Sequence, residues 1–265
     1  MISRRYILEW KKYAFWPEDF QVEQDLILEK VLIDLFSNDY LQKSLAFRGG
    51  TALHKIYLKP QVRYSEDIDL VQVKSEPIKE TLKIIRKTLD FLGRRPVIKQ
   101  KKDNNTIIYR FMSEIPPQIK LRIKLEINCR EHFSVLGYKD INYGIDNSWV
   151  GETGLVKTYY PEELLGTKII ALYQRKKGRD LFDLYYALKN LDLDYNKIID
   201  CYGKYISFSV KNPPTKKQII RNIEKKLSDP DFVGDIYALL RPGVEYNQEE
   251  AFYLVKEKLL DRMTS

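Results

Sequence analysis

Two aspartates separated by one residue are the side chains of this sequence best suited to chemistry. Asp67 and Asp69 lie in the segment Ser65-Glu66-Asp67-Ile68-Asp69-Leu70. If this segment is a strand, both carboxylates project from the same face, because side chains alternate along a strand. Two adjacent negative charges repel each other and require a cation, and a divalent cation there can bind phosphate oxygens and orient an attacking hydroxyl. The pair therefore indicates a site for Mg²⁺ or Mn²⁺.

A third carboxylate for that site comes from a segment with strict alternation. Between Lys120 and Asn128, apolar residues alternate with polar ones, which predicts a strand with one buried face. Glu126 is the acidic residue of the polar face, and its basic neighbours are not expected to compete for a metal. We predict that Glu126 binds the metal and accepts the proton of the nucleophile. The alternative is a salt bridge from Glu126 to Lys124 or Arg122 on a solvated face of the sheet.

A Gly-Gly pair before the aspartates predicts a phosphate-binding turn. The apolar run 45–47 precedes Gly49 and Gly50, and residues 51–58 have helical spacing, so we expect strand, tight turn and helix. Glycine lets a phosphate approach the backbone, and a helix N-terminus offers amide groups and a positive dipole. Thr51 adds a hydroxyl at the same place.

The other periodic segments predict a mixed α/β part followed by a helical part. Helices are expected over 17–36 and 76–92, a strand over 68–73, and a hairpin with strands 96–102 and 106–112 around Asp103-Asn104-Asn105. After Val150 strand signals fade, except over 155–158, and helical patterns occur at 161–175, 179–190, 195–205, 214–227, 231–240 and 248–263. We predict an α/β (α+β) fold class: a mixed sheet flanked by helices in residues 1–158, then a helical bundle in 159–265.

Composition and charge limit the class of protein. Hydrophobic residues form 44% of the 265-residue chain and charged residues 31%, enough for a folded core under a charged surface. We expect a cytoplasmic protein with no membrane partner, because no apolar run approaches the roughly 20 residues of a membrane span and the N-terminus lacks a secretory signal. The two cysteines and two histidines form no zinc or disulfide motif, which leaves carboxylates and hard cations.

The formal net charge of +8 is concentrated in one region. Residues 157–227 contain 15 Lys and Arg residues against 8 Asp and Glu residues. A region of this kind can bind the phosphates of a nucleic acid. The alternative is a lysine-rich helix surface that faces only solvent.

Several segments resemble a known family. Phe47-Arg48-Gly49-Gly50-Thr51-Ala52-Leu53 and Arg63–Leu70 are similar to motifs of the AbiEii/AbiGii toxin family in the polymerase-β-like nucleotidyltransferase superfamily. Glu162–Lys168 and Arg175–Leu184 resemble its later lysine and Arg-Asp-x-x-Asp motifs, so the similarity spans roughly Leu45 to Leu188. The wider superfamily usually has Gly-Ser in place of Gly49-Gly50. It also usually has fewer residues between this pair and the acidic pair than the sixteen found here. The toxin subgroup shares both departures.

The resemblance implies roles for individual residues. Asp67 and Asp69 would bind metal, Lys168 would contact phosphate or stabilise the transition state, and the triphosphate and nucleotide would be bound by Gly49, Gly50, Thr51, Ser65, Arg179, Asp180 and Asp183. From spacing alone, Lys168 shares a helix face with apolar residues, so we expect it to point inward, towards the first domain, rather than into solvent. Asp180 and Asp183 also suit a capped helix N-terminus, which needs no catalysis.

Together these features predict a nucleotidyltransferase that uses a nucleoside triphosphate and Mg²⁺ or Mn²⁺, and releases pyrophosphate. The resemblance implies the toxin of a bacterial toxin–antitoxin or phage-defence pair with a cognate antitoxin, and the basic region favours RNA, such as the tRNA acceptor end, as acceptor. One alternative is transfer to a small molecule or to a protein, including the enzyme itself. Another is a non-catalytic module that binds nucleic acid or a partner, although the intact acidic pair argues against it.

Overall fold

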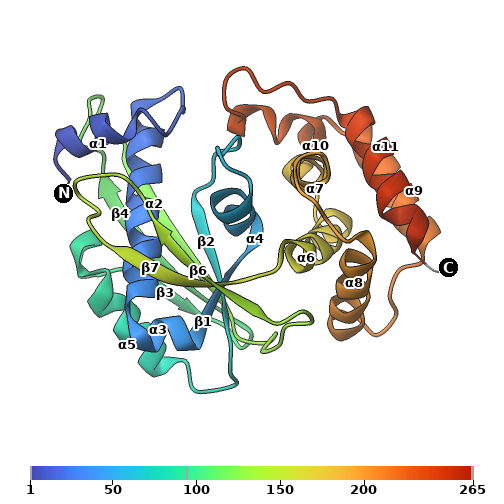
Figure 1. Cartoon of the computed structure of the whole chain (residues 1–265), viewed down its shortest axis with the longest axis horizontal. Helices are drawn as coiled ribbons and strands as arrows, with labels where there is room; N and C mark the ends of the chain where they lie inside the picture. The colour runs from blue at the N-terminus through green and yellow to red at the C-terminus, as the bar shows by residue number, and fades with distance from the viewer. Residues whose placement is uncertain (1, 94, 264–265) are drawn as a thin grey trace. The chain divides into compact units, whose positions relative to one another are not determined.

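A seven-stranded sheet organises the first of two structural units (Figure 1). The computed structural model describes residues 2–93 and 95–263. The first unit contains the chain up to Ala52 with Tyr64–Ser134 and Tyr138–Tyr159, and the second contains Leu53–Arg63, Val135–Gly137 and the chain from Tyr160 onward. The division into domains at residues 158 and 159 stays a prediction.

The sheet mixes parallel and antiparallel strands in the order β3-β4-β5-β2-β1-β7-β6. β2 pairs in parallel with β5, and β1 with β7, whereas the other neighbouring pairs are antiparallel. This architecture confirms the predicted mixed α/β class. The bounds of the strands are β1 Leu45–Arg48, β2 Asp67–Gln72, β3 Val97–Gln100, β4 Asn104–Met112, β5 Lys120–Asn128, β6 Tyr138–Gly144 and β7 Thr153–Tyr159.

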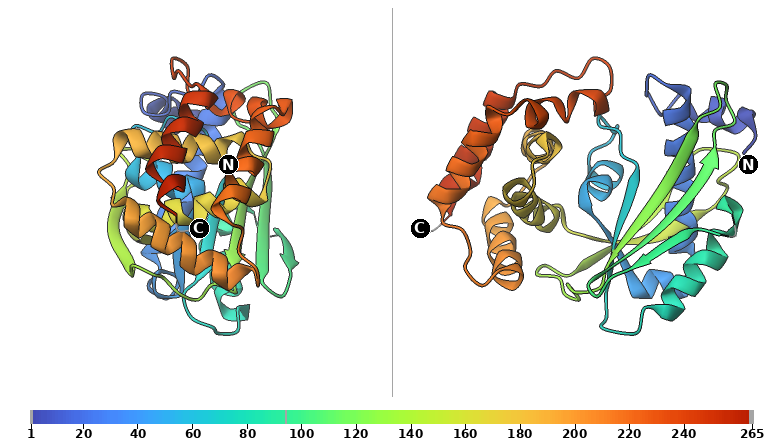
Figure 2. Two further views of the ribbon diagram at one scale, coloured as in Figure 1. Left: turned by 90° about the vertical axis from the view of Figure 1, so that its right-hand side faces the viewer. Right: turned by 180° about the vertical axis from the view of Figure 1, so that it is seen from behind.

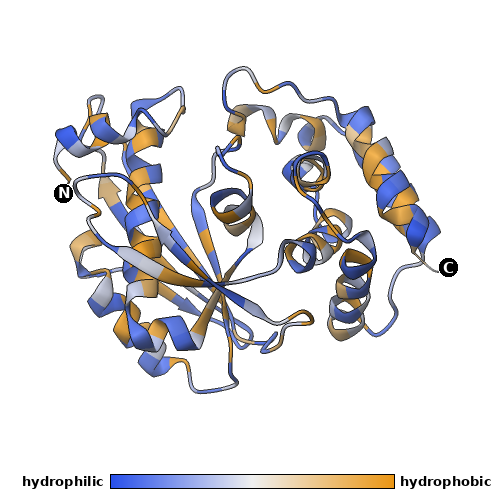
Figure 3. Ribbon diagram, in the orientation of Figure 1, coloured by the Kyte–Doolittle hydropathy of each residue, from blue (hydrophilic) through white to orange (hydrophobic). Residues whose placement is uncertain are grey.

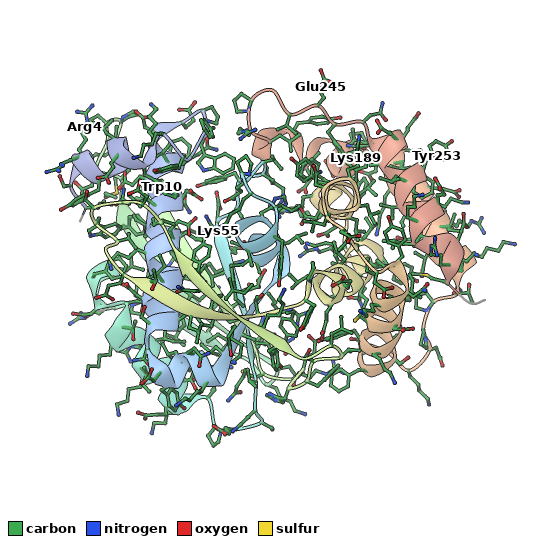
Figure 4. All side chains as sticks on the ribbon, viewed as in Figure 1. Arg4, Trp10, Lys55, Lys189, Glu245 and Tyr253 are labelled. Carbon is green, nitrogen blue, oxygen red and sulfur yellow. The ribbon has the colours of Figure 1, made fainter. Side chains whose placement is uncertain are left out.

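Helix α2 (Asp19–Ser37) packs along one face of this sheet (Figure 1). A Cβ atom at Gly154 of β7 would lie 2.9 Å from the carbonyl oxygen of Ile33, so the glycine lets the helix backbone approach the strand. Trp10, labelled in Figure 4, donates its indole hydrogen to the buried Asp25 of α2 over 2.9 Å. The other helices of this unit are α1 Arg4–Trp10, α3 Asp39–Ser44, α4 Gly49–Ala52 and α5 Lys79–Thr88.

The second unit is built from helices (Figure 2). α6 packs on α7 and α8, and α11 packs on α7. A Cβ atom at Gly166 of α6 would lie 2.9 Å from the carbonyl oxygen of Ile198, so this glycine allows close helix packing. Apolar residues line the helices in bands (Figure 3), and no helix in the described residues has the length and hydrophobicity to span a bilayer. The bounds are α6 Pro161–Gln174, α7 Gly178–Asn190, α8 Tyr195–Ser209, α9 Lys216–Leu227, α10 Pro230–Gly234 and α11 Gln248–Lys258.

Most predicted elements are confirmed, and the differences have local causes. β6 was not predicted, because most of its residues are exposed or half-buried at the sheet edge and the strand lacks an apolar alternation. Asn104 and Asn105 belong to β4 rather than to the hairpin turn, since both pair with β5. The helix predicted over 231–240 ends at Gly234, and a short 3₁₀ turn follows at Tyr237–Leu239.

Candidate active site

The three predicted carboxylates lie on two adjacent central strands. In the parallel pairing of β2 with β5, Asp69 lies opposite Glu126 and Asp67 lies opposite Lys124. Asp67 and Asp69 are half-buried, whereas Ile68 between them is fully buried, so both carboxylates belong to the same face of β2 as predicted. The sheet therefore places the acidic pair beside Glu126.

Lys124 is bound to two carboxylates in this group. Its Nζ lies 2.7 Å from Oδ2 of Asp67 and 3.2 Å from Oε1 of Glu126. The alternative expectation, a salt bridge from Glu126 to Lys124, is therefore confirmed. The expectation that basic neighbours of Glu126 would not compete for a metal stays a prediction. Burial lowers the pKa of Lys124, but the hydrogen bonds and charges of Asp67 and Glu126 outweigh it, so the pKa is raised above the usual lysine value.

The Gly-Gly turn lies directly against the acidic strand. Gly49 has a positive φ of 79°, and a Cβ atom there would lie 2.3 Å from Oδ2 of Asp69. Only glycine fits both the backbone conformation and this close approach. The two glycines form the first residues of α4 rather than a turn before it, and α4 continues into a π-helical turn at Leu53–Tyr57.

Hydroxyl groups fasten this turn to the start of β2. The buried Thr51 hydroxyl donates to the carbonyl oxygen of Asp67 over 2.7 Å. Its oxygen also makes a hydrogen bond with Ser65, and Ser65 is the donor because the hydrogen of Thr51 is already used. Thr51 and Ser65 thus hold the glycine turn and the aspartates together, while their roles as nucleotide ligands stay predictions.

Replacing Gly49 with alanine tests this close packing. We expect a loss of about 1–3 kcal/mol of stability from the left-handed backbone alone, together with reduced nucleotidyl transfer because the added methyl group displaces Asp69. The matched control is Gly203→Ala in α8, where a Cβ atom meets nothing within 4 Å. Thermal melting and transfer rates of both variants provide the measurement, and equal melting temperatures for the two would contradict the prediction.

The carboxylates of Asp67, Asp69 and Glu126 have the chemistry expected of ligands to a divalent cation. Oδ1 of Asp67 is buried without a hydrogen-bond partner, and an ammonium cation already contacts Asp67 and Glu126. Carboxylate oxygens are the ligands that Mg²⁺ and Mn²⁺ prefer. Within the described residues, no three His, Cys, Asp or Glu side chains are arranged to hold a metal ion in their present positions. The metal roles of Asp67, Asp69 and Glu126 therefore stay predictions.

A second charged cluster lies within the helical unit and centres on Asp183, which is fully buried. Arg63 donates through Nε over 2.8 Å to Oδ1 and through Nη2 over 3.1 Å to Oδ2. Nζ of Lys168 lies 2.9 Å from Oδ2, and Nε2 of His54 lies 2.9 Å from Oδ1. Burial alone would raise the pKa of Asp183, but Arg63, Lys168 and His54 together lower it well below its usual range.

Asp180 extends this cluster to the end of α6. Lys168 donates to its Oδ1 over 3.1 Å, and Arg175 makes two further bonds of 2.6 and 2.7 Å. Lys168 is only 6% exposed, so the expectation that it avoids solvent is confirmed. Its anionic partners are Asp180 and Asp183 of the same helical unit, and the expected direction towards the first domain stays a prediction. A phosphate role for Lys168 stays a prediction.

The capping interpretation of Asp180 and Asp183 is wrong. α7 begins at Gly178, its N-cap residue Lys177 makes no side-chain cap, and both aspartates bind buried cations instead. The amide of Arg179 donates to Asp235 over 3.3 Å, and the guanidinium of Arg179 pairs with the same carboxylate. Arg179 therefore belongs to a separate contact, and nucleotide binding by Arg179, Asp180 and Asp183 stays a prediction.

Four residues of these clusters were not predicted from the sequence as site residues: Arg63, His54, Lys124 and Arg175. Arg63 lies in a motif that resembles the family, but its buried partner lies 120 positions away. His54 has a partner 129 positions away. The alternation of the sequence places Lys124 on the polar face of β5, but its contact with Asp67 depends on the register between β2 and β5.

Comparisons with known proteins identify the family and the fold. A family model described as nucleotidyl transferase AbiEii toxin, type IV toxin–antitoxin system, matches residues 30–257. The nucleotidyltransferase toxin MenT4 from Mycobacterium tuberculosis has a similar structure, with a TM-score of 0.65, 16% identity, and coverage of 100% of this chain and 91% of that one. JHP933 from Helicobacter pylori has a similar structure, with a TM-score of 0.58 and 17% identity; the alignment covers 91% of this chain and 90% of that one.

At these identities the two structures show a shared fold. No curated protein sequence matches the chain. The family match, however, covers most of the chain and includes both charged clusters. The protein therefore belongs to the AbiEii nucleotidyl transferase toxin family of type IV toxin–antitoxin systems and is a nucleotidyltransferase.

Proposed function

We propose that this nucleotidyltransferase depends on Mg²⁺ or Mn²⁺ held by Asp67, Asp69 and Glu126, and transfers a nucleotidyl group from a nucleoside triphosphate to a hydroxyl of RNA. The observation that carries the proposal is the register of β2 and β5, which sets Asp69 opposite Glu126 beside the Gly49 turn. A bound divalent cation would neutralise phosphate charge and polarise the group transferred.

The protein's own residues would position the reactants. Gly49 and Gly50 begin α4 and carry no side chains, so a phosphate could approach their backbone, while Thr51 and Ser65 hold the start of α4 against the start of β2. Glu126 would accept the proton of the attacking hydroxyl. In the second unit, Lys168, Arg179, Asp180 and Asp183 would contribute to nucleotide binding.

The basic part of the chain supports RNA as the acceptor. Lys176, Lys177 and Lys216 already pair with aspartates of the same unit, so RNA phosphates would compete with those carboxylates. A clearer surface is the α9 stripe, which consists of the exposed residues Lys217, Arg221 and Lys225. These residues recur every four positions, so they share one helix face and can follow a phosphate backbone. The tRNA acceptor end is the RNA segment that we propose.

We propose a biological setting on the basis of the family. The toxin would act in the bacterial cytoplasm, possess a cognate antitoxin, and take part in phage defence. The acceptor is the feature that most separates this proposal from its alternative, in which the nucleotidyl group goes to a small molecule or to a protein, including the enzyme itself.

Label transfer tests the proposal directly. Purified protein is incubated with total RNA, Mg²⁺ and, in separate reactions, each nucleoside triphosphate labelled at its α-phosphate. The Asp67→Asn, Asp69→Asn double variant is the negative control. We expect label on RNA with the wild type alone. Label on protein would support the alternative acceptor, and no label with any nucleotide or acceptor would contradict the proposal.

Charge removal from the α9 stripe then tests the RNA surface. Changing Lys217, Arg221 and Lys225 to glutamine should weaken RNA binding across sequences and flatten its salt dependence. The matched control removes Lys79, Lys83 and Lys87, an exposed stripe of the same spacing on α5. Equal effects of the two triple variants would show that general charge, rather than α9, attracts the RNA.

A further inference from the structure

We propose that Lys124 couples metal binding to nucleotide binding, because its ammonium group holds Asp67 and Glu126 until a triphosphate draws it away. The inference rests on the proposed function, since it assumes that these carboxylates bind the catalytic metal. It adds a role for a residue outside that ligand set. Lys124 acts as an internal counterion that a divalent cation must displace.

The first support is the position of the ammonium. Lys124 lies opposite Asp67 in the β2–β5 register, and its Nζ is 2.7 Å from Oδ2 of Asp67 and 3.2 Å from Oε1 of Glu126. The two carboxylates come from different strands, so one cation links both sides of the site. The Lys124 side chain is 22% exposed, against 55% for the nearby Arg122, which pairs at 3.8 Å with Glu66.

The second support is electrostatic. A divalent cation that bound the same oxygens would lie within a few ångströms of the ammonium group, and the two positive charges would repel each other strongly. Lys124 must therefore release Asp67, Glu126 or both before those carboxylates can serve as metal ligands. A lysine can do so because its charge is carried on a flexible four-carbon chain.

A nucleoside triphosphate would make that release favourable. Its phosphates offer Lys124 a new anionic partner and add negative charge that attracts the metal. Each ligand then improves binding of the other, and by linkage the improvement is reciprocal. Lys124 would thus make the site take up metal together with nucleotide rather than in advance of it.

Metal binding in the absence of catalysis tests the inference. Mn²⁺ affinity is measured by electron paramagnetic resonance for wild type and Lys124→Met, with and without a triphosphate analogue that cannot be cleaved between its α- and β-phosphates. We expect weak Mn²⁺ binding to wild type alone and about tenfold or stronger binding with the analogue. In Lys124→Met we expect Mn²⁺ alone to bind about tenfold more tightly than in wild type, and the analogue to add little.

Two controls make the result specific. Lys120→Met removes an exposed lysine from the same face of β5 and should leave Mn²⁺ affinity and its coupling to the analogue unchanged. Lys124→Gln should reproduce the effect of Lys124→Met with a polar side chain, provided that circular dichroism shows both folded. If both Lys124 variants bind Mn²⁺ as wild type does, the inference is overturned but the proposed function is not. If wild type fails to bind Mn²⁺ even in the presence of the triphosphate analogue, both the proposed function and the inference are overturned.

Discussion

Replacing Asp69 with asparagine is expected to lower kcat/KM for nucleotidyl transfer on the order of 10³-fold, without a comparable loss of thermal stability. Asparagine keeps the shape of the side chain, so the close approach of Asp69 to Gly49 can persist. It removes the negative charge that would hold the cation and align the triphosphate. Because Asp67 and Asp69 repel each other, the folded state should tolerate this loss of charge.

A neighbouring carboxylate supplies the control for this prediction. Glu66 precedes β2, is 42% exposed, and lies 3.8 Å from Arg122 rather than in contact with Lys124. Glu66→Gln should therefore keep kcat/KM within a few-fold of wild type. Steady-state rates at saturating Mg²⁺ provide the comparison, and an Asp69→Asn enzyme with more than about a tenth of wild-type activity would refute a direct role in catalysis.

Replacing Asp183 with alanine is expected to destabilise the protein by about 3–5 kcal/mol. The substitution removes the anion that Arg63, Lys168 and His54 share in a fully buried position. Arg63 would lose this carboxylate in a buried position and Lys168 would keep only the one from Asp180, so the loss exceeds that of an ordinary surface ion pair. Thermal melting and denaturant unfolding of the variant measure the effect.

The control for Asp183 is an aspartate of the same unit that is open to solvent. The side chain of Asp231 is 88% exposed and pairs with Lys176, so Asp231→Ala should change the melting temperature little. If Asp183 serves the nucleotide without supporting the fold, Asp183→Ala would lose activity at an unchanged melting temperature. That result would contradict the structural role.

The same cluster predicts how stability depends on pH. The pKa of Asp183 is lowered in the folded state, so its stabilising contribution is complete above the unfolded pKa of about 4 and is lost as the pH falls further. Burial also lowers the pKa of His54, although Asp183 opposes that effect. His54 therefore costs stability below about pH 6.5, where the unfolded chain takes up a proton. Melting temperatures of wild type should fall across these ranges, and the loss below pH 4 should shrink in Asp183→Ala.

The strand that carries Glu126 shows how far sequence alone can go. The alternation over residues 120–128 predicted β5 with its observed bounds and face, because the period of two is a property of the local backbone. The Asp-x-Asp spacing predicted a shared face for the same reason, and the Gly-Gly pair marked a place where backbone approaches another group. Family motifs in the chain also predicted the nucleotidyltransferase family, which the family match confirms.

Tertiary structure decided which of these residues are neighbours. The β2–β5 register sets Asp69 opposite Glu126 and brings Lys124 onto Asp67, and alternation within each strand is compatible with other registers. Asp183 was predicted as a nucleotide ligand or a helix cap, but folding surrounds it with Arg63, Lys168 and His54. Local spacing determined the type and face of each element, because these depend on adjacent backbone geometry. Pairing of charges far apart in the chain depends on how elements pack and exclude water, and only the folded structure settles that.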